Sequence, residues 1–450
     1  MGAENPTRRR SHRLKGERRC SPRIAPLLSR QRPPRRLSRV DERVEMDEET
    51  ILENFRNELR NWLEANCPKA LRDSAANTKN SPRQEDHAAW LKACASRGYT
   101  TPTWPKEYGG GGLSKEEHSI LLEEIDRIGT HIAPVSFFGT SMLGPVLLEF
   151  GSEAQKKEHM PKITSGEIQW CQGYSEPGAG SDLASLQTRA VRQGNDFIIN
   201  GSKIWTTGAH HADWMFCLVR TDPNAPKHDG ISFILFDLHQ PGVTISPLML
   251  ISGQSDFCQV FFEDVKAKAE NLVGELNAGW TIAKRLLQHE RSMLSGGMPG
   301  GARPSKKESG SQKATAPRSY LAESARPYLG EEGGQLNDPI LRDQIAQYEL
   351  DSLCFGLSLQ RSGQEAKAGQ GPGAASSMFK LYASEMNKRR SELVMSIQGA
   401  SGLGWEGEGF TPGELFETRG WLRSKGNSIE GGTSEVQLNV IAKRVLGLPD

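Results

Sequence analysis

Two short segments carry residue types suited to holding a phosphate or a heteroaromatic ring. The first spans residues 170–182 and reads WCQGYSEPGAGSD. Gly178 and Gly180 would let the backbone approach a ligand closely, while Ser175, Ser181 and the loop amides supply hydrogen-bond donors. A turn between two domains would have the same composition, so these residues alone leave both interpretations open.

The second segment, KIWTTG at residues 203–208, offers the aromatic face of Trp205 and the hydroxyls of Thr206 and Thr207. It comes shortly after an apolar run that ends in Asn-Gly at 200–201, a dipeptide typical of hairpin turns. We therefore expect a hairpin at 200–201, with the aromatic and hydroxyl residues just beyond it. Taken alone, such a tryptophan is more often a packed strand residue than a cofactor platform.

Two glycine patterns are weaker signals. Residues 402–407 match G-x-G-x-x-G, but they follow the helical run 378–397, whereas a dinucleotide site needs a strand in front of the glycines. We expect this loop to end a helix. The GGGG run at 109–112 lacks the Gly-Lys-Ser/Thr of a P-loop, so a surface turn is predicted there.

No metal or disulfide site is expected. His210 and His211 would point to opposite faces of a strand, and no H-x-x-x-H accompanies them. The cysteines are seven in number, scattered and without C-x-x-C, which favours free thiols in a reducing compartment. They are Cys20, Cys67, Cys94, Cys171, Cys217, Cys258 and Cys354.

The elements that must position these residues change type along the chain. Residues 46–165 have helical periodicity, with capping boxes predicted at Thr50-x-x-Glu53 and Ser114-x-x-Glu117. Short β-rich runs at 214–219, 231–238 and 260–265 predict a small antiparallel barrel or sandwich over 166–275. Helical periodicity returns over 276–450, with a polar loop expected at 300–318. This segregated order predicts the α+β class.

Composition excludes several classes of protein. In 450 residues, 36% hydrophobic and 25% charged, no run approaches the roughly 18 apolar residues of a membrane helix, so no integral membrane segment is expected. Residues 1–45 hold 14 Lys+Arg and 5 Asp+Glu, a net charge of +9, which leaves −8 for the remainder. An acidic body excludes a nucleic-acid partner for the fold itself.

The basic segment 1–45 admits three interpretations: a mitochondrial transit peptide, a tail for nucleic acid or membrane, or translated upstream sequence with Met46 as the start. We favour the last because organised sequence begins directly after Met46. The segment is then a disordered leader, its prolines breaking any helix. A bacterial, cytoplasmic protein is expected, with mitochondrial import as the alternative.

From about residue 46 onward the chain resembles the acyl-CoA dehydrogenase family. The shared motifs are WPKEYGG (104–110), GSEAQK (151–156), SEPGAGSD (175–182), WTTG (205–208), FFEDV (261–265), NLVGE (271–275) and EGGTSE (430–435). The resemblance implies an N-terminal helical domain, a middle β-barrel domain and a C-terminal four-helix bundle domain that hold FAD and an acyl-CoA thioester.

The resemblance also implies cofactor contacts. Ser175, Gly180 and Ser181 would face the flavin and its pyrophosphate, with Ser181 also near the substrate. Trp205, Thr206 and Thr207 would surround the isoalloxazine ring, with a hydroxyl toward N5. The turn from Gln398 to Gly402 would meet the adenine part of a cofactor in a neighbouring subunit. The flavin's other edge would contact Thr433, Ser434 and Glu435.

The implied reaction needs a carboxylate base in a dry pocket, where desolvation raises its pKa. Many family members carry the base where this chain has Gly431, and Glu430 one residue earlier would point elsewhere. Another branch uses a Glu-Arg pair on the first helix of the C-terminal domain, which corresponds to Glu290 and Arg291. At about 100° per residue, position 290 falls in the middle of that helix's apolar face.

We therefore expect Glu290 to be the base, the Gly431 amide to donate to the thioester carbonyl, and Arg291 to organise the CoA side of the pocket. A buried carboxylate merely neutralised by an arginine is the structural alternative. The expected product is the trans-2-enoyl-CoA, in a fatty-acid, dicarboxylate or steroid route of lipid metabolism. The alternatives are a catalytically silent subunit that completes a partner's FAD site, or a flavin monooxygenase on the same fold.

The family's Arg-x-x-Phe-Gly stretch, which holds the FAD pyrophosphate of the adjacent subunit, is altered here to RPYLG at residues 326–330. Bacterial members that lack it often pair with a homologous subunit. We therefore expect an α2β2 heterotetramer, with a homo-oligomer as the alternative. Electron-transferring flavoprotein is the acceptor that the resemblance implies.

Overall fold

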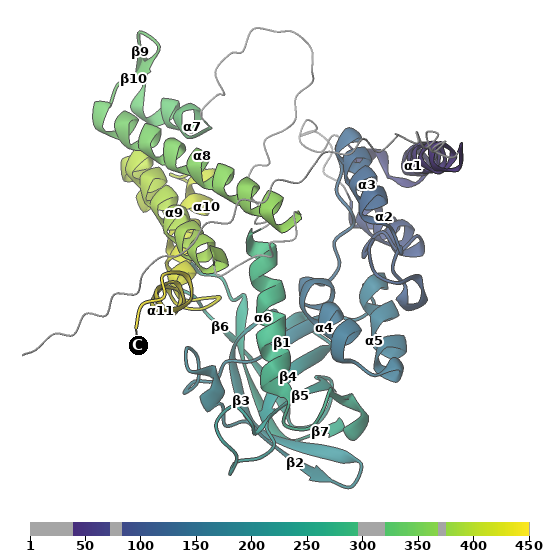
Figure 1. Ribbon diagram of the computed structural model, residues 1–450. Helices are drawn as coiled ribbons and strands as arrows, with labels where there is room; N and C mark the ends of the chain where they lie inside the picture. Colours follow the sequence, from purple (N-terminus) through teal and green to yellow (C-terminus); the bar gives the residue numbers. More distant parts are fainter. Residues whose placement is uncertain (1–38, 73–82, 296–319, 368–374, 450) are drawn as a thin grey trace, which may run out of the picture. The chain divides into compact units, whose positions relative to one another are not determined.

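The computed structural model describes the backbone of residues 39–72, 83–295, 320–367 and 375–449 (Figure 1). Side chains are described within these ranges except at 39–48, 288–295, 366–367 and 375–376. The polar loop expected at 300–318 lies outside the described residues. The chain divides into two compact units, Met1–Asn54 and Phe55–Asp450. Within the described ranges, no helix is long and apolar enough to cross a membrane.

The first described helix, α1, spans Arg39–Asn66 and so begins seven residues before Met46. The last part of the segment interpreted as a leader is therefore helical. The physical reason is that its last proline is Pro34, after which nothing breaks a helix. Thr50 lies inside α1, so the prediction that it starts a helix is wrong. The remainder of the leader, residues 1–38, lies outside the described residues.

In the described part of the chain, four further α-helices precede the sheet, and Ser114 starts one of them as predicted. Its hydroxyl accepts from the Glu117 amide at 3.1 Å, and the Glu117 carboxylate accepts from the Ser114 amide at 2.8 Å. This reciprocal capping box satisfies two amides that the first turn leaves free. The four helices are α2 (Gln84–Ser96), α3 (Lys115–Arg127), α4 (Gly144–Phe150) and α5 (Glu153–Ser165).

The glycine run at 109–112 is not the surface turn predicted from its composition. Gly110 and Gly111 are buried. A Cβ on Gly110 would lie 2.3 Å from the Trp104 carbonyl oxygen, and one on Gly98 would lie 2.3 Å from the Gly110 carbonyl carbon. Backbone segments therefore pack directly on one another here, which only glycine permits.

The middle of the chain forms one eight-stranded sheet in the order β6-β7-β3-β2-β4-β5-β8, with β1 paired to β4. Neighbours are antiparallel except β1 with β4 and β2 with β4, which are parallel. The strands are β1 (Trp170–Gly173), β2 (Arg189–Gln193), β3 (Asp196–Thr207), β4 (Trp214–Arg220), β5 (Ile231–Asp237), β6 (Val243–Leu248), β7 (Phe257–Lys268) and β8 (Leu272–Val273).

The expected hairpin at 200–201 is wrong, because Asn200 and Gly201 lie inside β3. Between the pairs Ile199–Val265 and Gly201–Phe262, Asn200 alone on β3 lies opposite Glu263 and Asp264 on β7. Asp264 has φ 52°, so the bulge is in β7, opposite the dipeptide. The tight turn that joins β2 and β3 is Gly194-Asn195, because Gln193 pairs with Asp196 across it.

Strand β4 is covered on both faces, which fixes the sheet between two apolar cores. Phe216 and Leu218 belong to one core and Met215 and Cys217 to the other. Helix α6 (Gly279–Ser295) adds Ile282, Ala283 and Leu286 to the core of Phe216, and it runs along the sheet against β5 (Figure 1). Such two-sided burial is why β4 has a continuous apolar sequence without alternation.

The chain ends in helices, which confirms the predicted order of helices, sheet and helices and the α+β class. A third core forms around Leu321, Ile345 and Leu393. On α8, Leu350, Leu353 and Leu357 are exposed at helical spacing. The elements are α7 (Tyr320–Leu329), β9 (Glu331–Glu332), β10 (Gln335–Leu336), α8 (Pro339–Lys367), α9 (Ala375–Gln398), α10 (Pro412–Ser424) and α11 (Ser434–Val440).

Candidate active site

A buried ion pair joins the two segments singled out in the sequence. The Lys203 side chain is fully buried, and its Nζ donates to Glu176 Oε1 at 2.8 Å and to the Tyr174 carbonyl at 3.0 Å. The Glu176 carboxylate also accepts from the amides of Gln187 (2.6 Å) and Thr188 (2.9 Å). Burial raises the pKa of the Glu176 carboxyl, but Lys203 and these hydrogen bonds outweigh it and hold the pKa below its usual value.

The loop after Glu176 is closed at its base and open at its tip. Glu176 and Ala179 exchange two backbone hydrogen bonds, at 3.1 and 3.0 Å. Beyond them, Gly178 and Gly180 are exposed, and a Cβ on either would meet nothing within 4 Å. Ser181 is exposed as well. The loop therefore offers accessible backbone on a fixed base, which is the arrangement expected of a ligand-binding turn.

The Trp205 ring is turned out of the sheet by a second irregularity in the β3–β7 pairing, and this one is in β3. The β3–β7 register shifts between Lys203 and Thr206, and Trp205 has φ 59°, an uncommon value for a non-glycine residue. Its side chain is 56% exposed. Thr206 is buried, and its Oγ1 has no hydrogen-bond partner, whereas Thr207 is half-buried. The bulge thus exposes an aromatic face, while the residue after it keeps an unsatisfied hydroxyl buried.

The predicted contacts at the C-terminal motif occupy a glycine turn before α11. Gly431 and Gly432 have φ 65° and 92°. Gln437 Nε2 donates to the Gly431 carbonyl at 3.1 Å, and Lys380 Nζ donates to the Gly432 carbonyl at 2.7 Å. Both contacts use carbonyl groups and not the Gly431 amide. They are therefore compatible with the prediction that this amide donates to the thioester carbonyl.

Thr433 and Glu435 form the start of α11. The Thr433 hydroxyl accepts from the Val436 amide at 3.2 Å and so caps the helix. Glu435 is exposed. Hydrogen bonds from its own amide and from Thr433 hold the pKa of its carboxyl below the usual value. The two residues therefore stabilise the helix end beside the glycine turn, and their contacts with flavin stay predictions.

Glu430 is held in an ion pair at the surface. Arg423 donates to its Oε2 at 2.8 Å, Asn427 donates to its Oε1, and its side chain is 40% exposed. A partly exposed carboxylate that is already held by two donors does not lie in the dry pocket that the proposed reaction needs. The geometry therefore supports the prediction that Glu430 does not replace Glu290.

Gln398 and Gly402 lie at the end of α9. The helix stops at Gln398, and the short 3-10 helix Gly399–Leu403 follows. This confirms the prediction that the G-x-G-x-x-G glycines end a helix instead of following a strand. Gln398 is buried with Oε1 lacking a hydrogen-bond partner, and the Gly402 carbonyl accepts from Thr418 Oγ1 at 3.2 Å.

Glu290 and Arg291 are in the last part of α6, where their side chains lie outside the described residues. The backbone there is helical to Ser295. Position 290 follows the buried Leu286 by four residues, so both positions share one face of α6. The role of Glu290 as the base and that of Arg291 at the CoA side stay predictions.

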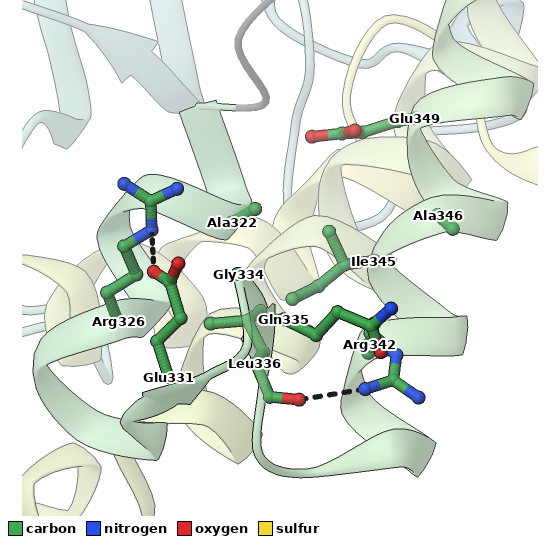
Figure 2. Close-up of a pocket in the computed structure, with 10 residues that line it drawn as sticks. All are labelled: Ala322, Arg326, Glu331, Gly334, Gln335, Leu336, Arg342, Ile345, Ala346 and Glu349. Atoms are coloured by element: carbon green, nitrogen blue, oxygen red, sulfur yellow. Dashed lines mark hydrogen bonds and ion pairs between the residues drawn. The ribbon is translucent and has the colours of Figure 1, made fainter.

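Arg326, the nearest match to the altered family stretch, is already paired. Its Nε donates to Glu331 at 2.7 Å, beside a pocket whose opposite side is formed by α8 (Figure 2). In the same pocket Arg342 donates to the Leu336 carbonyl at 2.9 Å. The Arg326 guanidinium therefore has an acidic partner within its own chain.

The two adjacent histidines are not on a strand, so the prediction that they face opposite ways is wrong. They form the 3-10 turn Ala209–His211, and their ring centroids are 3.9 Å apart. His210 Nδ1 lies 3.1 Å from the buried Sγ of Cys258. Among the residues with described side chains, no group of three His, Cys, Asp or Glu residues could hold a metal ion.

Comparison with known proteins agrees with this geometry. Models of the acyl-CoA dehydrogenase family match the N-terminal domain at residues 50–167, the middle domain at 171–265 and the C-terminal domain at 329–446. Acyl-CoA dehydrogenase IpdE1 of Mycobacterium tuberculosis is 35% identical over 410 residues, which cover 88% of this chain and 98% of the relative. The chain therefore belongs to the acyl-CoA dehydrogenase family.

It is an acyl-CoA dehydrogenase, an oxidoreductase of lipid metabolism. Two solved structures are similar over 89% of this chain and 98% of their own. The Tcur3481-Tcur3483 steroid ACAD has a TM-score of 0.65 at 32% identity. The ChsE4-ChsE5 complex from Mycobacterium tuberculosis has a TM-score of 0.63 at 27% identity.

The residues present fit a flavin, the cofactor of this family. A ring would find the exposed face of Trp205, and the next residue of β3, Thr206, holds a buried hydroxyl that has no hydrogen-bond partner. A diphosphate would find the accessible backbone at Gly178 and Gly180. The Oε1 of Gln398 is a further acceptor that has no hydrogen-bond donor in this structure.

The ion pair that links the loop to β3 was not predicted from the sequence. Phe197 and Ile199 are buried in one apolar core, and Lys203 is separated from them by an even number of positions along the strand. Since alternate residues share a face, a lysine there needs a buried carboxylate partner. That signal could have led to Glu176, whereas the φ of Trp205 had no such signal.

Proposed function

We propose that this acyl-CoA dehydrogenase performs FAD-dependent α,β-dehydrogenation of an acyl-CoA thioester to the trans-2-enoyl-CoA. The observation that carries the proposal is the exposed Trp205 ring on the bulge of β3, which the buried pair of Lys203 and Glu176 joins to the Ser175 loop. The residue after Trp205, Thr206, adds a buried hydroxyl without a partner. FAD, when bound, would accept the β-hydrogen as hydride at N5. The protein must then bind the thioester and remove the α-proton.

In this proposal Glu290 removes the α-proton. Its position on the face of α6 that buries Leu286 supports a desolvated carboxylate, whose pKa would rise toward the working range. The Gly431 amide would donate to the thioester carbonyl as negative charge builds there. Arg291 would hold the CoA side. Ser175, Ser181 and Thr207 would complete the flavin contacts, with Gln398, Gly402, Thr433 and Glu435 at its other parts.

The test compares Glu290→Gln with Glu430→Gln, since both remove one negative charge from a glutamate. The purified, FAD-loaded protein is mixed anaerobically with acyl-CoA thioesters, and bleaching of the flavin absorbance is followed. We expect Glu290→Gln to lose at least about 10³-fold in rate, as removal of a general base does, and Glu430→Gln to lose far less. If the two variants exchange these behaviours, the base is Glu430.

A catalytically silent subunit is the alternative function. In that case the chain would bind no acyl-CoA productively, and Glu290→Gln would change the activity of the assembled enzyme by no more than Glu430→Gln does. The same comparison therefore separates the two functions.

We also propose that the chain assembles as an α2β2 heterotetramer with a homologous subunit. Two observations support this: Arg326 is neutralised by Glu331, and α8 exposes Leu350, Leu353 and Leu357 in a row. The Tcur3481-Tcur3483 and ChsE4-ChsE5 structures each name two different subunits. A stable, FAD-saturated homotetramer of the chain alone would contradict the proposal.

Because the similar Tcur3481-Tcur3483 protein is a steroid ACAD, a steroid-derived acyl-CoA thioester is our first choice of substrate class. A panel that includes straight-chain, dicarboxylic and steroid-derived thioesters tests this choice by relative kcat/KM. Electron-transferring flavoprotein is the proposed acceptor, and a bacterial cytoplasm is the proposed location. Reduction of that acceptor by the substrate-reduced enzyme is the direct measurement.

A further inference from the structure

The backbone around Ser175 is held by a single buried ammonium group. Lys203 Nζ contacts the residues on either side of Ser175: it donates to the Tyr174 carbonyl at 3.0 Å and to the Glu176 carboxylate at 2.8 Å. The next residue in β3 adds a third contact, because the Ile204 amide donates to the Ser175 carbonyl at 2.9 Å. Ser175 is thus fixed from both neighbours and from its own carbonyl.

The same lysine starts the bulge that exposes Trp205. Regular β3–β7 pairing runs through Lys203 to Val260 and resumes at Thr206 with Cys258. Between these pairs lies Trp205, with φ 59°. Because Lys203 is fully buried and bonded at its tip, the beginning of the bulge has a fixed position.

The cost of burying two charges indicates that the pair has a purpose beyond stability. A buried ion pair is often no more stabilising than apolar residues of similar volume, because both ions lose their hydration. Here the pair sits where the Ser175 loop and the Trp205 bulge must keep a fixed relation. Glu176 also uses both carboxylate oxygens on backbone amides, those of Gln187 and Thr188, which ties down the far side of the loop.

We infer that Lys203 and Glu176 are positioning residues of this dehydrogenase: their buried contact sets Ser175 against Trp205 and Thr206 at the geometry that the flavin requires. The inference rests on the proposed function, since it presupposes a flavin at these residues. Neither side chain contacts the reacting atoms in this assignment. They act through the backbone that they hold.

Three variants separate positioning from simple stability: Lys203→Met, Glu176→Gln, and the double variant with both changes. Each single variant leaves one buried charge without its partner: Glu176 in the first and Lys203 in the second. The unfolding temperature of the flavin-free protein therefore falls. The double variant is neutral, and its glutamine oxygen still accepts from a backbone amide. Its flavin-free unfolding temperature recovers toward wild type.

Flavin binding does not recover in the double variant, because the Tyr174 carbonyl has lost its donor and Ser175 is no longer held. We expect the FAD dissociation constant to stay about tenfold or more above wild type and the flavin absorption bands to remain shifted. At saturating FAD, we expect a large fall in kcat and a smaller change in the KM for the acyl-CoA. These readouts differ from what a purely structural pair would give.

The matched control is Glu124→Gln, a second buried carboxylate far from these segments in sequence. Glu124 is 2% exposed and pairs with Arg60 at 2.9 Å and Arg127 at 2.6 Å. It should lose stability without changing the FAD dissociation constant or the flavin spectrum. If the double variant recovers flavin affinity together with stability, the positioning role is overturned. If the wild-type chain, alone or with its partner subunit, binds no FAD, the proposed function fails first.

Discussion

The guanidinium carbon of Arg423 lies 5.1 Å from the centroid of the Phe257 ring. That ring meets Trp205 edge-on at a centroid distance of 6.1 Å, and Arg423 also pairs with Glu430 at 2.8 Å. Helix α10 therefore touches the outward tryptophan of β3 through one phenylalanine. It also touches the residue directly before the Gly431 turn. Two parts of the candidate site, distant in sequence, share this arginine.

Replacing Arg423 with methionine should disturb both parts moderately. A cation over an aromatic ring and a partly exposed ion pair together contribute about 1–2 kcal/mol, so we expect kcat/KM to fall roughly tenfold. Steady-state kinetics measure the change. Lys425→Met is the matched control, since Lys425 lies over Trp421 at 4.9 Å and pairs with Glu392. An equal loss in both variants would count against a role specific to Arg423.

Thr206→Val should lower the affinity for FAD without lowering the stability of the flavin-free protein. The Thr206 Oγ1 is buried without a partner, so its removal should leave the flavin-free protein as stable as wild type or more stable by about 1 kcal/mol. FAD affinity should fall in the same variant. Thermal unfolding and fluorescence titration with FAD provide the two measurements.

The comparison for this prediction is Thr188→Val, whose hydroxyl donates to the Ser202 carbonyl at 3.2 Å. It should lose about 1 kcal/mol of unfolding free energy, because the Ser202 carbonyl loses the hydrogen bond from this hydroxyl. Equal destabilisation by both variants would mean that the Thr206 hydroxyl has a partner in the flavin-free protein.

Two glycine substitutions should have opposite effects. Gly110→Ala would bring a Cβ to 2.3 Å from the Trp104 carbonyl oxygen, and we expect a loss of about 1–3 kcal/mol of unfolding free energy. Gly180→Ala meets no neighbour within 4 Å, so stability should stay unchanged while FAD affinity falls. Chemical denaturation and FAD titration of both variants test this pair. Normal FAD affinity in Gly180→Ala would show that no ligand approaches that backbone.

His159 should make the fold sensitive to acid. Its ring is 1% exposed, lies between Trp170 (5.4 Å) and Trp214 (5.1 Å), and has both nitrogens unpartnered. Burial lowers the pKa of His159 from 6.5 to about 4. Between these values the unfolded chain binds a proton that the folded chain does not bind, so stability falls as the pH falls from 6.5 to 4.

The loss reaches up to about 3 kcal/mol near pH 4 and disappears as the pH rises past 6.5. Carboxylates titrate in part of the same range, so the useful quantity is the difference between wild type and His159→Phe, which keeps an aromatic ring between the tryptophans. Denaturation at pH 7, 6, 5 and 4 should show a smaller loss in the variant. Parallel curves would mean that His159 is protonated in the folded protein.

The order of elements could be predicted because it depends on local periodicity. The strand that became β4 and the capping box at Ser114 are local patterns, and the chain forms both. Asn200-Gly201 misled for a physical reason: the dipeptide favours a turn locally, but here it pairs with β7, which takes up the irregularity as a bulge at Asp264.

The site was predictable where residue type alone carries the signal and not where tertiary packing decides. Ser175 and Trp205 stand out by composition and by resemblance. The burial of Gly110 and the pairing of Arg423 with Phe257 depend on segments far away in sequence, which no local pattern specifies. Lys203 is intermediate, since strand alternation puts it inward and the identity of its partner comes only from the fold.

The exposed cysteine on α8 is a site where a fluorescent dye can be attached. Cys354 lies among Leu350, Leu353 and Leu357 and is exposed, while the other cysteines of the described ranges are buried. With Cys20 replaced by serine, a thiol-reactive dye would attach to α8 at this point. Its emission would then change when a second subunit covers the leucine row, so assembly could be timed in solution without touching the chemistry.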